Sequence, residues 1–332
     1  MAVRPEGRAA TIADVASAAA VSQATVSRVV NGKSTVDPAI ARRVLDVVEA
    51  LGYRASASAR NLARGSTQTV AVVVPDLGNP MFQEVLRGVT HAAAVAGYRV
   101  LVADSEESLD DEPELALEAR RRCDALVLVA PRMPEARLAE LLPSLAPVVL
   151  VNRSVVGVPD VAVDYAAGAA AALEHLAARG HERIAYLAGP PSSESNRRRL
   201  EGLDRSRERH PSVVVTTIPC GATIDDGARA AGLVSDATAV IAFNDLVAFG
   251  LLAALRDRGV DVPGRVSVVG FDDIEFASYA TPPLTTVAVP RRDLGARAWD
   301  ALFAEIAGGE PARPLLFTPS LVVRASTGPV PS

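Results

Sequence analysis

The sequence predicts a chain of two parts, a small all-α unit at the N-terminus followed by a large α/β region with two parallel sheets. Two observations carry this prediction. Within the first 55 residues, apolar side chains recur at helical spacing between residues that cap helices. From residue 69 onward, short β-branched runs alternate with alanine-rich stretches, a pattern typical of parallel strands covered by helices on both faces.

Composition limits the class of protein. The 332 residues are enough for two or three domains, and 49% of them are hydrophobic, so we expect globular folding. Neither an export signal nor an uncharged apolar stretch of about 18 residues is present, and we expect a cytoplasmic protein without a membrane contact. Cys123 and Cys220 lack disulfide or zinc-site spacing, and we interpret both as buried, small apolar residues.

The charge is distributed unevenly along the chain. The formal net charge is −5, yet residues 1–65 carry nine basic and five acidic side chains, a charge of +4, which leaves −9 for the rest. Only the N-terminal fifth therefore has the electrostatics of a phosphate-binding surface. The alternative is that this charge belongs only to solvated helical faces.

Three short helices are expected within residues 11–52. Each begins at a side chain that caps a helix, namely Thr11, Ser22 and Asp37, and Gly52 suits the end of the third helix. The turn between the first two helices is only two or three residues long. Such a turn forces a steep crossing, as in a helix-turn-helix.

The second expected helix has two distinct faces. Valines fall together on one side, and a mostly polar arc of about 140° falls on the opposite side. The arc consists of Gln23, Ala24, Ser27, Arg28 and Asn31. This face could enter a groove of DNA, and the alternative is a small helical bundle that packs on the rest of the protein.

The segment TIADVASAAAVSQATVSRVVNGKSTVDPAIARRVLDVVEALGY resembles the headpiece of LacI/GalR transcriptional regulators across three helices and their caps. The resemblance implies a DNA-binding headpiece in residues 1–55, in which Gln23 and Ala24 determine operator choice and Arg28 reaches a base edge. The chemistry agrees, because arginine can donate two hydrogen bonds to guanine, glutamine can pair with adenine, and alanine can contact a thymine methyl.

Other polar headpiece residues would position the protein on phosphates rather than specify sequence. By resemblance, these include Ser22, Thr25, Ser27 and Asn31, and simple solvated surface is the alternative for Thr25 and Ser27. The full headpiece set expected at DNA is Thr11, Ser22, Gln23, Ala24, Thr25, Ser27, Arg28, Asn31 and Tyr53.

Residues 56–68 are expected to form a hinge helix and linker. A helix this short is not stable alone in water, and the resemblance implies that it folds on DNA, with two hinges packed together in the minor groove. Leu62 stands where the family inserts a leucine wedge between base pairs, and Ala59 and Ala63 allow close approach of the two helices. The alternative is that Leu62 anchors the linker on the large domain.

Eight apolar runs are expected to be strands in the large domain, residues 69–332. They are residues 70–74, 99–103, 125–130, 148–151, 184–188, 213–217, 239–243 and 266–270. Ligands of parallel sheets bind beyond the carboxyl ends of the strands. Neither GxGxxG after the first strand nor GxxxxGK[ST] occurs, so a dinucleotide or P-loop cofactor is not supported, and we expect neither a cofactor nor a metal.

The segments that follow the strands resemble the effector domain of LacI/GalR proteins, which is two-lobed and shares the type I fold of periplasmic binding proteins. They read PDLGNPMF, NR, VDYAAG, GPPSSESNRRR, FNDLVAFG and GFDDIEFASYATPPLTTV. By position, the resemblance implies that the effector is bound by Asn79, Phe82, Asp164, Arg197, Asn244 and Asp272. Carboxylates, amides and a guanidinium suit a sugar or another polyhydroxylated ligand.

Several charged residues beside this set are suited to structural or solvated roles. Asp245 is as suited to capping a helix as to contacting ligand, Asp273 is expected to be structural, and Arg198 and Arg199 are expected to be solvated. Ala222 replaces an aromatic residue that stacks on the effector in many relatives, which makes an ordinary hexose doubtful.

Two departures from the family pattern concern the headpiece. Ala20 stands where a turn glycine is usual, and alanine tolerates positive φ poorly. Ala55 and Ser56 replace a common Pro-Asn pair, which would loosen the coupling between headpiece and hinge.

The resemblance also implies a symmetric homodimer, formed in the first lobe by helices near residues 81–96 and 111–122. A twofold dimer predicts a roughly palindromic operator, and no leucine heptads that would form a tetramerising tail follow residue 326. The expected mechanism is repression relieved when effector binding changes the lobes and the spacing of the hinges.

Two other functions compete with this one. A solute-binding protein of a transporter would share the large domain, but it needs an export signal and has no use for a DNA-reading headpiece. An enzyme acting on a sugar would use acidic pairs such as Asp225-Asp226 or Asp272-Asp273. Adjacent residues rarely converge from opposite sides of a substrate, as a two-carboxylate mechanism demands, so we do not expect an enzyme.

Overall fold

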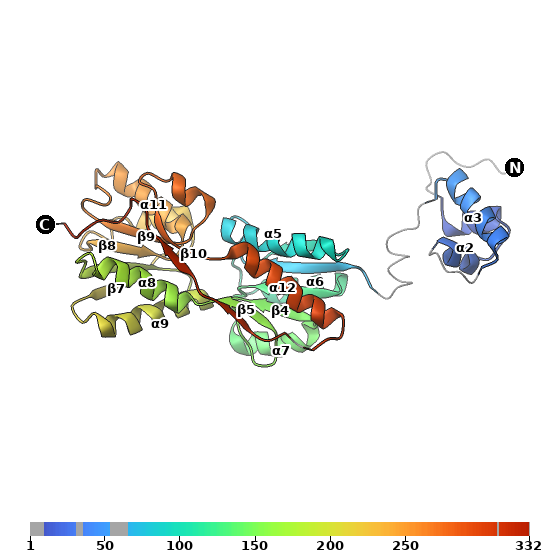
Figure 1. The fold of residues 1–332 in the computed structure, drawn as a ribbon, viewed down its shortest axis with the longest axis horizontal. Helices are drawn as coiled ribbons and strands as arrows, with labels where there is room; N and C mark the ends of the chain where they lie inside the picture. The colour runs from blue at the N-terminus through green and yellow to red at the C-terminus, as the bar shows by residue number, and fades with distance from the viewer. Residues whose placement is uncertain (1–9, 31–35, 54–65, 311, 332) are drawn as a thin grey trace. The chain divides into compact units, whose positions relative to one another are not determined.

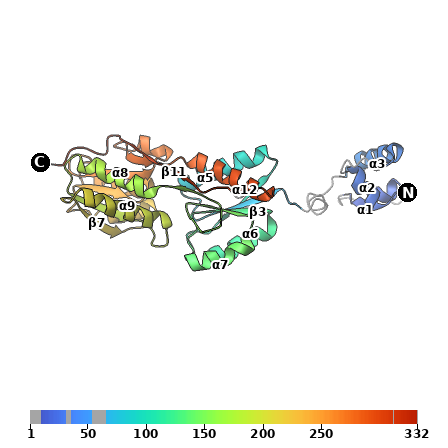
Figure 2. The ribbon, with the colours of Figure 1, turned by 60° about the horizontal axis from the view of Figure 1, so that its bottom comes forward.

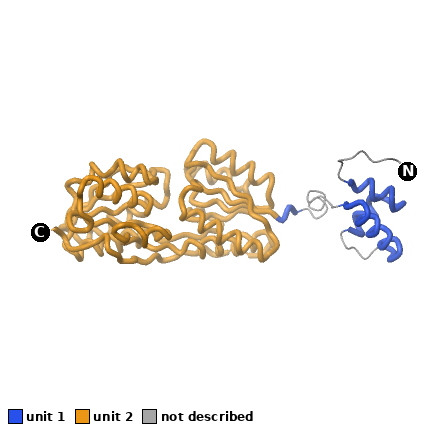
Figure 3. The backbone as a smooth tube through the Cα atoms, turned by 90° about the horizontal axis from the view of Figure 1, so that it is seen from above, with its two compact units in different colours: residues 1–68 blue, residues 69–332 orange. Residues whose placement is uncertain are grey.

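The computed structural model describes residues 10–30, 36–53, 66–310 and 312–331 (Figure 1). The chain divides into two compact units, residues 1–68 and residues 69–332 (Figure 3). Within the described part, none of the helices has the length and apolar character of a segment that crosses a bilayer. The division of the first unit into a headpiece and a hinge stays a prediction, since most of the expected hinge lies outside the described residues.

In the described part of the first unit, three short helices surround a small apolar core. They are α1 (Ile12–Ala18), α2 (Gln23–Val30) and α3 (Pro38–Ala50). The buried side chains of this core are Val15, Ala16, Ala19, Val26 and Val44. Each helix contributes at least one of them, so the three helices stabilise one another although none is long enough to be stable alone.

The expected helix caps are confirmed. Thr11 and Asp14 make both hydrogen bonds of a capping box at the start of α1. Ser22 Oγ accepts a hydrogen bond from Thr25 N at 3.1 Å at the start of α2, and Asp37 accepts from two backbone amides at the start of α3. These bonds satisfy N–H groups that a short helix would otherwise leave without partners.

The turn between α1 and α2 places a non-glycine residue in the left-handed region. Ala20 has φ +51°, as expected for a position where glycine is the usual residue. A Cβ at this φ costs about 1 kcal/mol. Gly52, which ends α3, has φ +59° and bears no such penalty.

The second unit begins with a six-stranded sheet in the order β11-β5-β4-β3-β1-β2, all parallel. The strands of this first lobe are β1 (Thr69–Val74), β2 (Arg99–Asp104), β3 (Ala125–Val129), β4 (Val148–Val151), β5 (Asp160–Val163) and β11 (Leu315–Phe317). Helices α5 (Pro80–Val95) and α12 (Arg291–Ile306) cover one face, and α6 (Glu112–Arg122) and α7 (Glu135–Leu145) cover the other.

The second lobe has a six-stranded sheet in the order β12-β10-β9-β8-β6-β7. Its strands are β6 (Arg183–Ala188), β7 (Val214–Pro219), β8 (Ala239–Ala242), β9 (Ser267–Asp272), β10 (Thr285–Ala288) and β12 (Ser320–Val322). Helices α8 (Tyr165–Ala177) and α9 (Glu194–Arg209) cover one face (Figure 2), and α10 (Ile224–Ala230) and α11 (Asp245–Asp257) cover the other. A short 3-10 helix, η1 (Glu275–Tyr279), follows β9.

The chain passes between the lobes three times, from β5 into α8, from β10 into α12, and from β11 into β12 (Figure 1). As a result, α12 and β11 belong to the first lobe although they follow most of the second lobe in sequence. Helix α12 packs along α5, where Gly88 and Gly295 allow close approach: a Cβ on Gly295 would lie 2.0 Å from the carbonyl oxygen of Val85.

All eight expected strands are present, and the helices expected near residues 81–96 and 111–122 correspond to α5 and α6. Four strands escaped sequence analysis, namely β5, β10, β11 and β12, because each has only three or four residues. One expectation needs correction. The second sheet is not purely parallel, since β12 runs antiparallel to β10.

Candidate DNA-binding surface and effector pocket

The outer face of α2 carries the side chains expected to read DNA. Gln23, Ala24 and Arg28 are exposed, while Val26 on the opposite side is fully buried in the core of the unit. Burial of Val26 fixes the rotation of α2 about its axis. The unburied face can therefore present the other three side chains without loss of core packing.

The residues expected at phosphates differ in their exposure. Ser22 is exposed, and its Oγ lies 2.9 Å from Thr25 Oγ1. Thr11, Thr25, Ser27 and Tyr53 are half-buried. Tyr53 packs against the apolar core of the first unit, so its ring also has a structural role.

Several predicted DNA contacts lie outside the described residues. They are Asn31 and, in the expected hinge, Ala59, Leu62 and Ala63, together with the departures at Ala55 and Ser56. Their roles stay predictions.

A pocket lies between the two lobes, at the carboxyl ends of the strands, where ligand binding is expected. The first lobe contributes Asn79, Phe82, Arg132 and Asn152, and the second contributes Tyr165, Arg199, Asn244 and Asp272, among others. We call this the central pocket. Its volume is about 20 Å³, enough for about one water molecule, so lobes or side chains must move apart to admit an effector.

Arg199 is the most unusual side chain of the central pocket. It is only 2% exposed, and the carbon of its guanidinium lies 4.4, 4.6 and 3.9 Å from the ring centroids of Tyr165, Phe243 and Phe271. Its Nε and Nη1 have no hydrogen-bond partner among the described residues, and Nη2 lies 3.9 Å from a carboxylate oxygen of Asp272. The aromatic rings stabilise the cation, but its N–H groups remain available to a ligand.

Asp272 ends β9 in a strained turn. It is 4% exposed with φ +104°, and Asp273 follows with φ +51°. Burial raises the pKa of Asp272 to about 7, although Arg199 and Arg291 lower it. Burial therefore favours the protonated form of this carboxyl, which can donate as well as accept a hydrogen bond.

Asp245 holds the turn that carries Asp272. Asp245 is fully buried, and its carboxylate accepts hydrogen bonds from Ile274 N at 2.8 Å and Thr286 Oγ1 at 2.6 Å. It neither caps α11, which is the role of Asn244, nor lines the central pocket. Burial and the nearby Asp272 raise the pKa of Asp245 well above its usual value.

Asp273 has the structural role expected of it. Its carboxylate accepts a hydrogen bond from Arg324 Nη2 at 2.7 Å. Asp245, which lies near Asp272 in space, and Asp273, which follows it in sequence, thus both have fixed partners within the protein.

Two predicted asparagines line the central pocket and also cap helices. Asn79 Oδ1 accepts from Met81 N at 2.9 Å at the start of α5, and Asn244 Oδ1 accepts from Val247 N at 2.9 Å at the start of α11. Asn244 Nδ2 donates to the carbonyl oxygen of Ala222. Phe82 lies in the same pocket and is 7% exposed.

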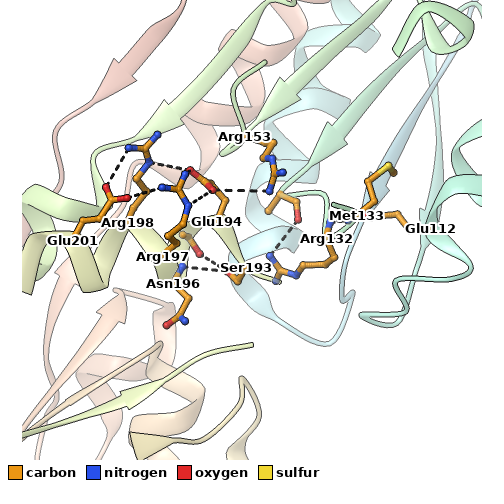
Figure 4. A network of polar contacts seen from close by, with 12 residues as sticks. Glu112, Arg132, Met133, Arg153, Ser193, Glu194, Asn196, Arg197, Arg198 and Glu201 are labelled. Atoms are coloured by element: carbon orange, nitrogen blue, oxygen red, sulfur yellow. Dashed lines mark hydrogen bonds and ion pairs between the residues drawn. The ribbon is translucent and has the colours of Figure 1, made fainter. Parts of the chain in front are cut away.

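The structure does not bring Arg197 to this pocket. Its side chain is 55% exposed and pairs with Glu194 and Glu201 on the surface of α9 (Figure 4). Arg198 pairs with the same two carboxylates, as a solvated residue can. The expectation that Arg199 is solvated is wrong, because successive residues of a helix point about 100° apart and the third arginine of the run faces the interior.

Asp164 also lies outside the central pocket. It is half-buried, and its carboxylate caps α8 by accepting from Ala167 N at 2.9 Å. It lines a separate cavity of about 740 Å³ beside the central pocket, between the loop that follows β4 and the surface of α9. Arg153 of that loop lies 3.9 Å from Glu194, an ion pair between the lobes (Figure 4).

Sequence reasoning missed Arg132, Asn152 and Arg199. Arg132 follows β3 and Asn152 follows β4, so the rule that ligands bind at carboxyl ends of strands points to both. Arg199 stands four residues before Leu203, a buried apolar residue of α9. That helical spacing is the signal that distinguishes Arg199 from its two neighbours.

Arg132 is held firmly in place. It is 3% exposed, and its Nε and Nη2 donate to the two carboxylate oxygens of Glu107 at 2.5 and 2.8 Å. Its backbone N–H and that of Met133 donate to the buried carboxylate of Glu112.

No group of His, Cys, Asp and Glu side chains suited to a metal ion occurs in the described ranges.

Two protein families match the chain. The one described as bacterial regulatory proteins, lacI family, matches residues 11–56, and the periplasmic binding protein-like domain matches residues 173–327. The HTH-type transcriptional regulator GalR of Escherichia coli is 36% identical over 329 residues, which cover 96% of this chain and 95% of the relative. The HTH-type transcriptional repressor CytR of Escherichia coli is 32% identical over 343 residues and is covered completely, as is this chain.

Solved structures agree with these relatives. A lac repressor dimer bound to operator and the anti-inducer ONPF matches with a TM-score of 0.82 and 28% identity over 97% of this chain and 100% of the other. A complex of the transcriptional regulator CelR with cellobiose matches with a TM-score of 0.70 and 29% identity over 96% and 99%. The chain belongs to the LacI family of bacterial regulatory proteins and is a DNA-binding transcriptional regulator.

Proposed function

We propose that this regulator is a repressor that binds a roughly palindromic operator through α2 and is released when a small polar effector occupies the central pocket. The observation that carries the proposal is the pairing of an exposed reading face with a buried polar pocket in one chain. The relatives that match over its full length include a transcriptional repressor and structures bound to operator or to a sugar.

In the headpiece, Arg28 donates to guanine, Gln23 pairs with adenine and Ala24 contacts a thymine methyl. Ser22, Thr25, Ser27, Thr11, Asn31 and Tyr53 position the protein on the backbone of DNA. In the hinge, Leu62 enters the minor groove, and Ala59 and Ala63 allow two hinges to pack together. The local charge of +4 of residues 1–65 supports a phosphate-facing surface.

In the effector domain, we assign the ligand to Asn79, Phe82, Asn152, Arg199, Asn244 and Asp272. Arg199 and Asn152 take the places proposed from sequence for Arg197 and Asp164, because both line the central pocket and carry N–H groups for which the described residues provide no partner. Asn79 and Asn244 each contact the ligand and cap a helix. Ligand binding is therefore coupled to the start of α5 in one lobe and to the start of α11 in the other.

We infer that the chain acts as a homodimer in the cytoplasm. One of the matched structures is a dimer bound to operator, and a second copy would cover apolar side chains that are exposed in a single chain. On the first lobe, where the interface is expected, these include Leu101 and Val102 of β2, which are 47% and 42% exposed. Sedimentation of the double variant Leu101→Ser, Val102→Ser should show more monomer than the wild type does.

The chain is not an enzyme in this proposal. Of the acidic pairs considered for catalysis, Asp226 already accepts hydrogen bonds from Ala222 N, Thr223 N and Thr223 Oγ1 as part of a capping box. Those bonds hold the pKa of Asp226 below its usual value although burial acts in the opposite direction. Such a carboxylate is poorly suited to act as a general acid.

The decisive experiment selects bound DNA from a random pool with the wild type, Arg28→Ala and the matched control Arg43→Ala. Arg43 is an exposed arginine of α3. We expect a palindromic motif from the wild type and the control, and loss of information at defined base pairs with Arg28→Ala. A wild type that recovers no motif at moderate salt would contradict the proposal. Tighter operator binding with the cognate effector would reverse the proposed sign of regulation.

A further inference from the structure

The central pocket contains two buried guanidinium groups that face it from different lobes. Arg132 comes from the loop after β3, and Arg199 comes from α9; they are 3% and 2% exposed. The carboxylates among the pocket residues are Glu107 and Asp272. Buried charges need compensation, so the partners of each group indicate what the pocket still lacks.

The acceptor oxygens of the pocket are mostly in use. Both oxygens of Glu107 accept from Arg132. Asn152 Oδ1 accepts from Val163 N at 3.1 Å, and the side-chain oxygens of Asn79 and Asn244 accept from helix N–H groups. The Asp272 carboxylate lies 3.9 Å from Arg199 Nη2, and burial raises its pKa, which disfavours its charged form.

The donors of the pocket are in excess. Arg199 Nε and Nη1 and Asn152 Nδ2 are buried and have no partner among the described residues. Arg132 has five N–H groups, and three of them donate, two to Glu107 and one to the carbonyl oxygen of Ala130 at 3.2 Å. The pocket therefore presents several N–H donors, with Asp272 as its main unused acceptor.

A neutral sugar matches this excess poorly. Each sugar hydroxyl brings a donor together with its acceptor lone pairs, so every hydroxyl placed in the pocket also requires an acceptor there. A carboxylate or a phosphate only accepts, and its hydrogen bonds to a guanidinium are about twice as strong as neutral ones. Aromatic rings surround the guanidinium of Arg199, so a ligand can be bound only through the N–H groups at its edge.

We propose that the effector carries a carboxylate or phosphate group on a polyhydroxylated skeleton, bound by Arg199 and Asn152, with Arg132 as the residue that selects the acidic ligand from the opposite lobe. This inference rests on the proposed function and narrows its ligand class. An anion bound between Arg132 of the first lobe and Arg199 of the second lobe attracts both guanidinium groups. The negative charge of the ligand therefore favours closure of the two lobes.

The test compares ligands that differ only in charge, by calorimetry and thermal melting of the full-length protein. The probes are D-galactose, D-galacturonate and D-galactose 6-phosphate, the corresponding glucose and ribose derivatives, and inorganic phosphate. We expect at least one acidic sugar to bind roughly tenfold or more tightly than its neutral parent, as one charge-assisted contact allows. The two kinds of acidic sugar distinguish a carboxylate from a phosphate.

Arg132→Gln should reduce the ratio of acidic to neutral affinity roughly tenfold. Arg198→Gln is the matched control, because Arg198 lies on the surface of the same helix as Arg199 and outside the central pocket. A second variant, Arg199→Gln, should abolish stabilisation by every acidic probe, phosphate included.

Three results would overturn the inference: a neutral sugar that binds as tightly as its acidic counterparts, an unchanged preference in Arg132→Gln, or no stabilisation by any anion. Operator binding by the same wild-type sample separates this failure from failure of the proposed function. Intact operator binding with release by a neutral sugar would reject the acidic ligand and leave the repressor assignment in place.

Discussion

The reading face of α2 and the central pocket use their side chains in opposite ways. Gln23, Ala24 and Arg28 are exposed on a single eight-residue helix, and none of them belongs to a core. Most of the pocket residues are buried, and they come from segments between residues 79 and 272. Function can therefore be changed in the headpiece without loss of stability, whereas the walls of the pocket are part of the folded core.

The largest expected effect tests this contrast in the layer of the pocket wall that lies behind Tyr165 and Arg199. Phe271 is fully buried, lies 5.5 Å from Tyr165 between ring centroids, and contacts the guanidinium of Arg199. Phe271→Ala should lower the free energy of unfolding of the large unit by about 3–5 kcal/mol, measured by chemical denaturation. Phe276→Ala, which removes a ring that is 58% exposed, is the control. Equal stability of the two variants would mean that the pocket wall is not part of the core.

The second effect concerns Asp272 and pH. Burial raises its pKa from 3.8 to about 7 in the folded protein, against the effects of Arg199 and Arg291. Because the folded protein binds this proton more tightly, the stabilising contribution is present below about pH 4 and is lost as the pH rises to about 7. Asp272→Asn should remove this loss, which is at most about 4 kcal/mol at about 1.4 kcal/mol per pKa unit.

The measurement is the free energy of unfolding at several pH values between about 4 and 8, for wild type, Asp272→Asn and Asp225→Asn. Asp225 is exposed on α10 and serves as the control. The pKa of the nearby Asp245 is also raised well above its usual value, so the difference between variant and wild type, rather than the wild-type curve itself, reports on Asp272. Parallel curves for variant and wild type would show that Asp272 is not protonated in the folded protein at neutral pH.

A third effect belongs to the headpiece. Arg28→Ala should weaken operator binding by about 1–3 kcal/mol, as loss of a two-bond contact with guanine does, while the free energy of unfolding changes by less than about 0.5 kcal/mol. Fluorescence anisotropy on the selected operator and thermal melts provide the two quantities. A large loss of stability in Arg28→Ala would mean that the reading face of α2, like the wall of the central pocket, is part of a folded core.

The smallest effect concerns the turn between α1 and α2. Ala20→Gly relieves a positive φ and should stabilise the isolated headpiece by about 1 kcal/mol. Thermal melting should show a higher melting temperature for the Ala20→Gly headpiece. It should show a lower one for Ala18→Gly, at the last residue of α1, because glycine is unfavourable in a helix. A destabilised Ala20→Gly would mean that entropy of the unfolded chain outweighs the relief.

The contrast also determines what can be predicted from sequence. The headpiece depends on local signals, such as the capping box of Thr11 and Asp14 and the valine stripe of α2, and these predict its helices correctly. Eight strands are predictable because each is a continuous apolar run. The four missed strands are short, and their pairing depends on chain crossings between lobes that local patterns do not report.

The pocket shows where local reasoning ends. Asn79, Phe82, Asn244 and Asp272 lie at the carboxyl ends of strands or within a few residues after them, and the structure brings all four together. Arg197 and Arg199 are harder to separate, because three consecutive arginines have the same chemistry and only the helical spacing between Arg199 and the buried Leu203 indicates which of them faces the interior. Asp164 has the position of a cleft residue in sequence, yet its capping bond holds it toward α8.

The late position of α12 and β11 in the sequence has a consequence for synthesis of the protein. A ribosome must deliver residues 291–317 before β5 can pair with β11, its second neighbour in the sheet, and before α12 can pack against α5. The headpiece can fold as soon as it emerges, but a chain that ends early exposes an unfinished sheet edge in the first lobe, which is prone to aggregation. Nonsense mutations even late in the gene should therefore yield insoluble fragments rather than shortened regulators.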